Sequence, residues 1–250
     1  MQTKLLEQSV LFEEAVPIQA VEPQRLYQQV AEQISELIRR GEFRAGDRLP
    51  AERDLARQLG VSRPVVREAM IALEIAGLVE VRTGAGIFVK ESKPDGGGLL
   101  ALSDVGPSPF DLIAARKLLE SEIAFAAAAS LTEADLAGIA ETLDRMEKAM
   151  ATGDDIEPFD RLFHARIAAS TRNTVLTAIV DQLWESMLTP LFSSLHLHTG
   201  LPAGQRATLA EHMDIFQALR SGDGATARDA MRRHLARVEA ILLSGDVTIA

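Results

Sequence analysis

The sequence contains no cysteine, which excludes disulfide bonds and thiolate metal sites. This absence is typical of a chain in the reducing cytoplasm, where we expect this protein to lie. Nor does any apolar run approach the ~20 residues that a membrane-spanning helix needs. The first residues include acidic ones and lack the basic start and apolar core of a signal peptide. We therefore expect no membrane partner.

A general excess of positive charge is also lacking, because the formal net charge is −10 at pH 7. The charge is unevenly distributed. Residues 23–91 hold eleven Lys and Arg against ten Asp and Glu, a net +1, whereas residues 110–250 hold thirteen against twenty, a net −7. A near-neutral segment still binds phosphates if its arginines share one face, since the local field matters more than the sum. The first segment is therefore the better candidate for DNA contact.

This first segment has the pattern of a winged helix-turn-helix. Apolar residues at helical spacing cover 26–38, and a short helix and a longer one follow. Ser62 is a plausible N-cap for the longer helix. Two alternating strands then flank a glycine-rich turn at 83–86. This order of elements predicts a DNA-binding domain over 23–91.

The rest of the chain has a different character. Residues 92–109 are rich in Gly, Pro and Ser and are interpreted as a linker, after which no strand alternation occurs. The expected helices cover 110–130, 132–152, 155–171, 173–198, 203–221 and 223–244. The predicted fold class is therefore mainly α, with a mobile tail over 1–22, the winged helix, and an antiparallel helical bundle over 110–245 for effector binding and dimerisation.

Three arginines of the winged helix are expected to read DNA. Arg63 and Arg67 are four residues apart and should share one face of the third helix, and Arg53 begins the preceding helix. Arginine suits this surface because it forks to guanine edges and pairs with phosphates. Taken singly, the three would be interpreted as ordinary solvated side chains. The glycines of 83–86 would let backbone amides approach DNA closely.

The order and identity of these residues resemble the GntR family of bacterial transcription regulators. The resemblance rests on GDRLPAERDLA at 46–56, GVSRPVVREA at 60–69 and GLVEVRTGAGIFV at 77–89. It implies a regulator rather than an enzyme, with double-stranded operator DNA as its partner. The positions that match DNA contacts of that family are Arg53, Ser62, Arg63, Pro64, Val65, Arg67, Thr83 and Gly84.

A second group of polar residues lies on three helices of the bundle. Asp160 and His164 are i, i+4 on one helical face, and His212 and His234 lie on two later helices beside apolar residues. One carboxylate and three imidazoles are good ligands for a divalent transition metal in a bundle interior. Spacing alone favours a simpler alternative, in which three unrelated histidines are each hydrogen-bonded near the core.

The helical half resembles the ligand-binding (FCD) domain of the FadR subgroup of GntR regulators. Many members of that subgroup bind a metal through an Asp-x-x-x-His pair and two later histidines. Asp160, His164, His212 and His234 match this pattern residue by residue. The resemblance implies a bound divalent transition metal ion, with zinc expected and nickel or manganese as alternatives.

Such a metal centre would attract an anionic effector. A divalent ion with one carboxylate and three neutral imidazoles keeps a net charge of +1 and open coordination positions. Arg116 and Asn173 match positions that line the pocket in this domain family and would bind a carboxylate and hydroxyls. The alternative for Arg116 is a surface salt bridge with Glu120. His196 and His198 are i, i+2 and are expected at a helix end or the surface, with the pocket mouth as an alternative.

Much of the chain is similar to bacterial repressors of hexuronate utilisation, through RLYQQ at 25–29, VVREA at 65–69 and ARKLLES at 115–121. This similarity implies a repressor that binds a palindromic operator as a homodimer and responds to a sugar acid, either a hexuronate or a related carboxylate. Two alternatives stay open: a metal-dependent hydrolase attached to a DNA-binding module, and a regulator whose metal is itself the signal or purely structural.

Overall fold

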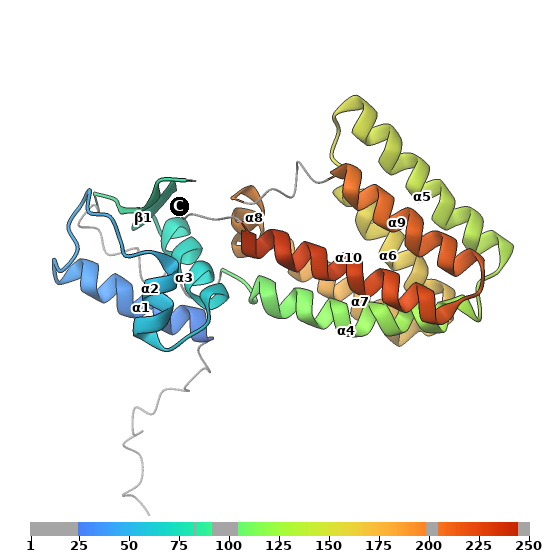
Figure 1. Cartoon of the computed structure of the whole chain (residues 1–250), viewed down its shortest axis with the longest axis horizontal. Helices are drawn as coiled ribbons and strands as arrows, with labels where there is room; N and C mark the ends of the chain where they lie inside the picture. The colour runs from blue at the N-terminus through green and yellow to red at the C-terminus, as the bar shows by residue number, and fades with distance from the viewer. Residues whose placement is uncertain (1–24, 83, 92–104, 199–204, 245–250) are drawn as a thin grey trace, which may run out of the picture.

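The computed structural model describes residues 25–82, 84–91, 105–198 and 205–244 (Figure 1). The expected tail, most of the expected linker and Thr83 lie outside these residues. The described part is mainly helical, which confirms the predicted fold class. It forms two halves that lie side by side, one blue to turquoise and the other green to red in Figure 1.

The N-terminal half has the predicted order of elements. Its helices and strands are α1 (Leu26–Arg39), α2 (Glu52–Leu59), α3 (Arg63–Ile75), β1 (Val79–Arg82) and β2 (Gly86–Val89). Helix α2 ends at Gly60, whose φ of 68° is the left-handed conformation that glycine adopts freely. Ser62 occupies the N-cap position of α3, as predicted, although its side chain makes no capping hydrogen bond.

The wing is an antiparallel strand pair held against the helices by one face. Val79 pairs with Val89, and Val81 pairs with Ile87. All four side chains are buried, because alternate residues of each strand point to the same side of the sheet. The strand pair is therefore fixed against the helices, as the base of a wing requires.

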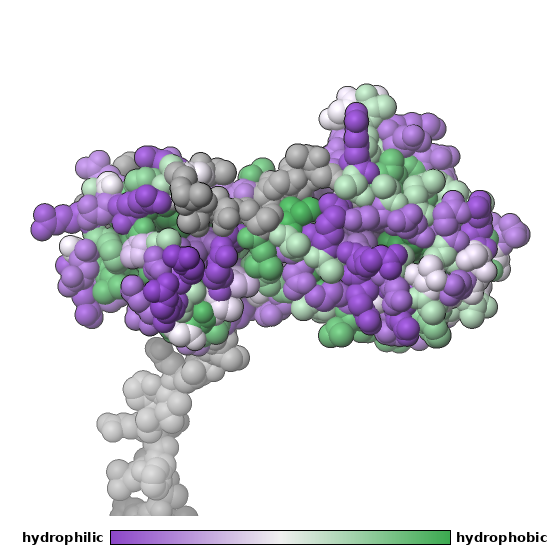
Figure 2. All heavy atoms as spheres, in the orientation of Figure 1, coloured by the Kyte–Doolittle hydropathy of each residue, from purple (hydrophilic) through white to green (hydrophobic). Residues whose placement is uncertain are grey.

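The C-terminal half contains seven helices in its described residues. They are α4 (Pro109–Ala128), α5 (Glu133–Thr152), α6 (Glu157–Ser170), α7 (Thr174–Ser186), α8 (Pro190–Leu197), α9 (Gln205–Arg220) and α10 (Gly224–Ser244). Helix α4 packs along α10, and α5, α6 and α9 pack beside them (Figure 1). No helix in the described ranges is long and apolar enough to cross a membrane. Hydrophilic side chains gather along the outer face of α10 (Figure 2).

The single helix expected over 173–198 is wrong. The chain forms α7 and α8 instead, with a break around Met187 and Leu188. Pro190 explains the break, because its ring clashes with the preceding turn and it has no N–H to donate, whereas the first position of a new helix accepts it. The break lets α8 leave the bundle and pack against α3.

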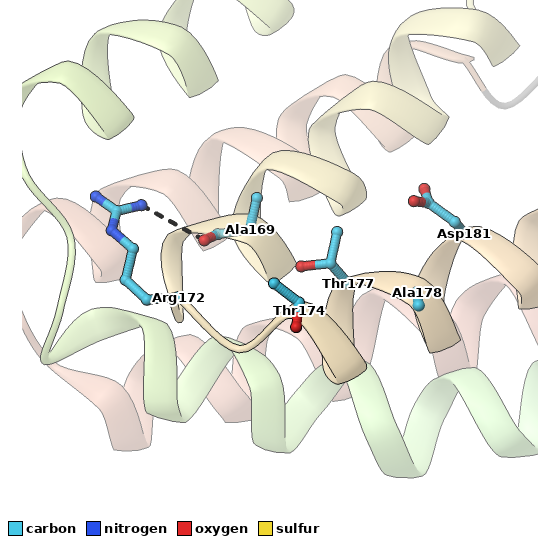
Figure 3. Close-up of a pocket in the computed structure, with 6 residues that line it drawn as sticks. All are labelled: Ala169, Arg172, Thr174, Thr177, Ala178 and Asp181. Atoms are coloured by element: carbon cyan, nitrogen blue, oxygen red, sulfur yellow. Dashed lines mark hydrogen bonds between the residues drawn. The ribbon is translucent and has the colours of Figure 1, made fainter.

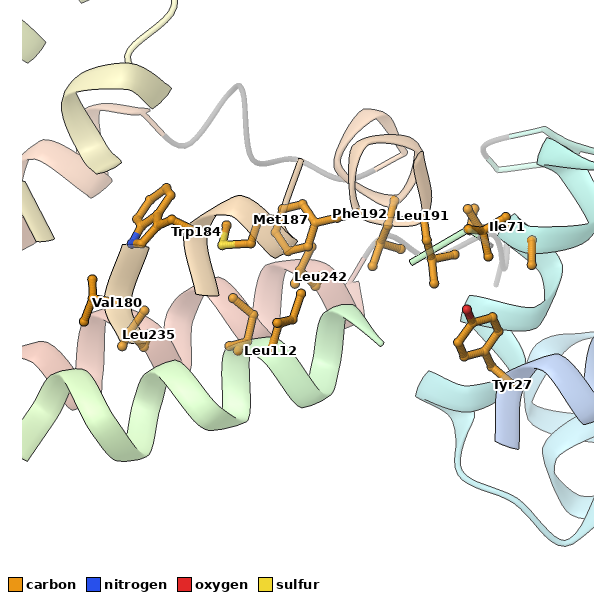
Figure 4. Packing of buried hydrophobic residues seen from close by; sticks show 14 of the residues in the cluster. Tyr27, Ile71, Leu112, Val180, Trp184, Met187, Leu191, Phe192, Leu235 and Leu242 are labelled. Carbon is orange, nitrogen blue, oxygen red and sulfur yellow. The ribbon is translucent and has the colours of Figure 1, made fainter. Parts of the chain in front are cut away.

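The two halves share one buried apolar cluster (Figure 4). The cluster runs from Trp184 and Leu235 within the bundle, past Phe192 and Leu191, to Ile71 of the winged helix. Polar contacts accompany it at the junction. The hydroxyl of Tyr27 donates a 2.7 Å hydrogen bond to the carbonyl of Gly106, just before α4. The two halves are therefore packed together, not merely connected.

Candidate metal centre and nucleic-acid interface

The structure brings Asp160, His164, His212 and His234 together from α6, α9 and α10. One potential ligand atom from each residue lies within 4.8 Å of the corresponding atoms of the other three. Oδ1 of Asp160 is 3.2 Å from Nε2 of His164 and 3.4 Å from Nε2 of His212. Nε2 of His212 is 3.3 Å from Nε2 of His234. One carboxylate oxygen and three imidazole nitrogens thus converge, as a metal ion requires.

Two of these histidines direct their second ring nitrogen at a carboxylate. Nδ1 of His164 faces Oε2 of Glu120. Nδ1 of His234 lies 2.9 Å from Oε2 of Glu211. Metal-binding histidines characteristically donate their remaining N–H to such a carboxylate, which fixes the ring and makes the free nitrogen a better ligand. The contacts therefore leave Nε2 of both rings for a metal.

The local electrostatics favour the protonation states that bind metal. Burial raises the pKa of Asp160, but the charges of the nearby histidines, His212 first, hold that pKa below its ordinary value. Burial lowers the pKa of His212 well below its ordinary value and also lowers the pKa of His234. An ionised carboxylate and two neutral imidazoles are ready to coordinate without first losing protons.

His164 has a different balance, because burial lowers its pKa but the charge of Glu120 and the contact with Asp160 raise it above the ordinary value. Oδ1 of Asp160 and Nε2 of His164 are both buried and, although 3.2 Å apart, make no well-aligned hydrogen bond. Buried polar atoms without partners cost free energy. A cation between these atoms would remove that cost, so the residues present fit a metal ion.

Arg116, expected to bind the effector, makes the pair with Glu120 that was the alternative, but this pair is buried instead of lying at the surface. Its Nε donates a 2.7 Å hydrogen bond to Oε1 of Glu120, and its guanidinium lies 4.1 Å from the ring centroid of Trp184. Although burial opposes it, the charge of Arg116 helps to lower the pKa of Glu120 to about 2. Arg116 therefore keeps Glu120 ionised beside His164. Nη2 of Arg116 donates to Oε2 of Glu120 at 3.5 Å, and Nη1 contacts the weak acceptor Sδ of Met187 at 3.3 Å.

Asn173 has a local role in this structure. Its side chain is exposed and caps α7, because its Oδ1 accepts hydrogen bonds from the backbone amides of Val175 and Leu176 at 3.0 and 3.3 Å. No contact joins it to the four metal-ligand candidates in the described part of the chain. That Asn173 lines the effector pocket stays a prediction.

An open surface pocket lies next to Asn173 (Figure 3). Its lining comprises Ala169, Arg172, Thr174, Thr177, Ala178 and Asp181, none of which belongs to the metal-ligand candidates. Arg172 is already paired with Asp135 at 2.7 Å. This pocket is therefore separate from the metal cluster.

Most of the candidate DNA-contacting residues lie at the surface. The Arg53 side chain is 77% exposed and that of Arg63 47% exposed. Ser62 is exposed as well, and Pro64 and Val65 are half-buried at the start of α3. Gly84, in the wing turn, is half-buried with a φ of 75°. Thr83 is outside the described residues.

Arg67 does not share the exposed face expected for Arg63. It is only 4% exposed, and its Nε and Nη2 donate hydrogen bonds to the two carboxylate oxygens of Glu52 at 3.0 and 2.9 Å. Its Nη1 donates to the carbonyls of Leu242 and Leu243 at the end of α10. These strong acceptors hold the guanidinium inside the molecule, away from any DNA in this conformation.

Sequence reasoning missed three residues of the metal-site surroundings. It indicates Glu120 only as a surface partner of Arg116, and it does not single out Glu211 or Trp184. The rings of Trp184 and His164 have centroids 5.4 Å apart. The position of Glu211 directly before His212 is a usable signal, because it places a carboxylate on the same helix turn as a ligand.

Comparisons with known proteins agree with this architecture. Residues 26–89 match the family described as bacterial regulatory proteins, gntR family, and residues 111–237 match the FCD domain. The Uxu operon transcriptional regulator of Escherichia coli K12 is 38% identical over 231 residues, which cover 90% of this chain and 89% of that protein. The Exu regulon transcriptional regulator of the same strain is 35% identical, with 91% and 88% covered.

Among solved structures, the one described as E. coli McbR/YncC aligns with a TM-score of 0.49 and 27% identity. The alignment covers 88% of this chain and 98% of that chain.

Proposed function

Because the chain belongs to the GntR family of bacterial transcription regulators and carries an FCD domain, we propose that a small carboxylate bound at the metal centre controls the affinity of the chain for operator DNA. One observation carries the proposal most strongly. The carboxylate of Asp160 and the Nε2 atoms of His164, His212 and His234 converge, and two of the rings are oriented by other carboxylates.

The DNA-binding part of the proposal rests on the exposed start of α3. Arg63 with Ser62, Pro64 and Val65 would enter the major groove, Arg53 would pair with phosphate, and the wing with Thr83 and Gly84 would follow the backbone. A domain with a net charge of +1 binds phosphates weakly. We therefore propose that the chain acts as a homodimer on a palindromic operator in the cytoplasm, because two half-sites bound together compensate for weak single contacts.

The effector part rests on the charge and polarity of the metal centre. Zinc, or alternatively nickel or manganese, would be held by the four ligand residues and would supply a Lewis-acidic positive charge for an anionic, oxygen-rich ligand. Arg116 would assist by turning Nη1 from Met187 toward a carboxylate oxygen.

The similarity to regulators of the Uxu operon and Exu regulon supports a sugar acid of the hexuronate class as effector and a repressor as output. The hydrolase alternative is not favoured, because the chain's relatives are transcription regulators and not enzymes.

The test uses a DNA duplex that the full-length chain selects from a randomised library. We expect galacturonate or glucuronate, added with Zn²⁺, to weaken binding of this duplex in a fluorescence anisotropy titration. His212→Ala should bind the duplex normally but lose the response to the sugar acid, because one metal ligand is missing.

His196→Ala is the matched control, since this histidine is not among the four ligand candidates. A binding curve that no sugar acid shifts in the presence of metal would remove the effector assignment. A response to chelator alone, with no organic ligand, would instead make the metal itself the signal.

A further inference from the structure

Helix α3 is buried without interruption along its middle. Every residue from Val66 to Leu73 is buried. A helix that packs on one side only would expose some of these positions, because each turn carries residues around the whole circumference. Both sides of α3 are therefore covered. One side packs on α1, α2 and β1, and the other packs on α8 of the helical half, with Ile71 and Leu191 in the same buried cluster (Figure 4).

Three polar residues of α3, Arg67, Glu68 and Glu74, fasten it to the helical half, and we call their contacts the α3 clasp. Nη1 of Arg67 donates to the carbonyl of Leu242 at 2.8 Å and to that of Leu243. The carboxylate of Glu68 accepts hydrogen bonds from the hydroxyl of Ser108 and the amide of Phe110, at the start of α4. Oε2 of Glu74 lies 2.6 Å from Nε2 of His198 at the end of α8.

The contact of Arg67 is the one that bears on DNA. The last carbonyls of a helix lack partners within the helix and carry the negative end of its dipole, so a guanidinium stabilises them well. With Glu52 on one edge and these carbonyls on the other, four hydrogen bonds of Arg67 are already in use. A DNA phosphate would have to displace the end of α10 before Arg67 could reach it.

We propose that the α3 clasp is an autoinhibitory contact, in which the end of α10 withholds Arg67 from DNA until the helical half releases α3. The inference rests on the proposed DNA contact of α3. Helix α10 also links the metal centre to this contact, because it carries His234 eight residues before Leu242. The two residues are therefore about 12 Å apart along the helix. A shift of α10 on ligand binding that closes the clasp would withhold Arg67 and weaken DNA binding, in line with the proposed response to a sugar acid.

His198→Ala tests the clasp without touching a DNA-contact or metal-ligand candidate. The side chain of His198 is 24% exposed, so its removal should leave the fold intact. If the closed state limits DNA binding, the apparent Kd scales inversely with the open fraction, and losing one half-buried ion pair should tighten binding up to about fivefold. The measurement is anisotropy with the selected duplex at fixed salt, using the full-length chain.

His196→Ala, two residues earlier on α8, is the matched control and should bind like the unaltered chain. A chain that ends at Ile241 removes both carbonyls that hold Arg67 and should bind at least as tightly as His198→Ala. Leu242 is fully buried, so this shortened chain needs a circular dichroism check. If the shortened chain fails to fold, the binding of His198→Ala alone tests the clasp. Binding by His198→Ala that equals or falls below the control would overturn the proposal.

A distance measurement gives an independent readout, because the chain has no cysteine of its own. Arg39 and Leu118 are both exposed, so spin labels on the double variant Arg39→Cys and Leu118→Cys would report the separation of α1 from α4, with labelled protein diluted into unlabelled protein. Saturating duplex should lengthen the distance, and an unchanged distribution would overturn the clasp. Two other outcomes would contradict the proposed DNA contact of α3 and not the clasp. In the first, the unaltered chain selects no duplex; in the second, Arg63→Ala binds the selected duplex as tightly as the unaltered chain.

Discussion

Glu211 illustrates how much of the metal centre depends on residues that would not touch the metal. It lies between His234, at 2.9 Å, and Arg237. Because a carboxylate on Nδ1 fixes the orientation of an imidazole and raises its basicity, losing it typically costs ten- to a hundredfold in metal affinity. We expect Glu211→Gln to weaken Zn²⁺ binding by about this factor in competition calorimetry.

Glu141→Gln is the control for this prediction. Glu141 pairs with Arg145 and Arg166 on the outside of the bundle and does not contact a ligand candidate. Its substitution should leave zinc affinity unchanged. Equal affinity in both variants would show that Glu211 does not position His234 for the metal.

Glu68 is a buried carboxyl within the clasp whose charge is poorly compensated. Burial raises its pKa to about 7, although hydrogen bonds from Ser108 and the Phe110 amide lower it, Asp111 raises it and Arg25 lowers it. A folded-state pKa above the ordinary value of 4.5 means that the folded chain holds the proton more tightly. The protonated Glu68 carboxyl therefore contributes fully to the stability of the folded chain below pH 4.5, and this contribution is lost as pH rises to about 7.

Between pH 4.5 and about 7, the unaltered chain should lose stability relative to Glu68→Gln, which has no carboxyl to ionise. We expect the free energy of unfolding of the variant to gain ~3 kcal/mol on that of the unaltered chain over this range. Urea unfolding at several pH values, with metal removed by chelator, measures it. Glutamine still accepts the two hydrogen bonds but carries no charge. A difference that stays constant with pH would show that Glu68 is not protonated in the folded chain.

At the level of elements, the junction before α4 is set by a close approach to the start of α8. Gly106 has a φ of 106°, and a Cβ there would lie 2.4 Å from Cβ of Thr189, which precedes α8. Gly106→Ala should therefore combine backbone strain of about 1 kcal/mol with a steric cost of about 2 kcal/mol. Urea unfolding should show a loss of roughly 3 kcal/mol.

Gly153→Ala is the matched control, because Gly153 also has a positive φ, of 77°, but has no atom within 4 Å of the Cβ position. It should lose only the strain of about 1 kcal/mol. If the two variants are equally destabilised, the loop at Gly106 moves away from Thr189 and does not fix the start of α8.

The elements themselves were largely predictable, and the reasons are local. Apolar spacing predicted α1, and Gly60 and Ser62 predicted the turn before α3. Both signals depend only on residues that are close together in the sequence. The break between α7 and α8 was missed although Pro190 signals it, since the apolar pattern continues on both sides.

The candidate ligands were predictable through their match to a family pattern, whereas the environment of Arg67 was not. Asp160 and His164 are one turn apart, so their shared face follows from the sequence. Arg67 and Leu242 are 175 positions apart, and their contact depends on how two halves dock, which no local pattern encodes. The same holds for the burial of the Arg116 and Glu120 pair.

At the scale of the whole molecule, the metal centre would join α6, α9 and α10, so metal binding should stabilise the entire helical half. Zn²⁺ held at about 100 times its Kd should raise the free energy of unfolding by about 2.7 kcal/mol. For a chain of this size this corresponds to an increase in Tm of roughly 5–10 °C. A thermal melt with Zn²⁺ or with chelator measures the shift.

The chain's single tryptophan separates binding at this centre from binding elsewhere. Trp184 has its ring centroid 5.4 Å from that of His164, so its emission should change as Zn²⁺ is added. His212→Ala should lose both the emission change and the rise in Tm, because three ligands hold the ion less well than four, whereas His196→Ala should keep both. If His212→Ala keeps the rise in Tm without the emission change, the stabilising ion binds at another place and the four convergent side chains are not its site.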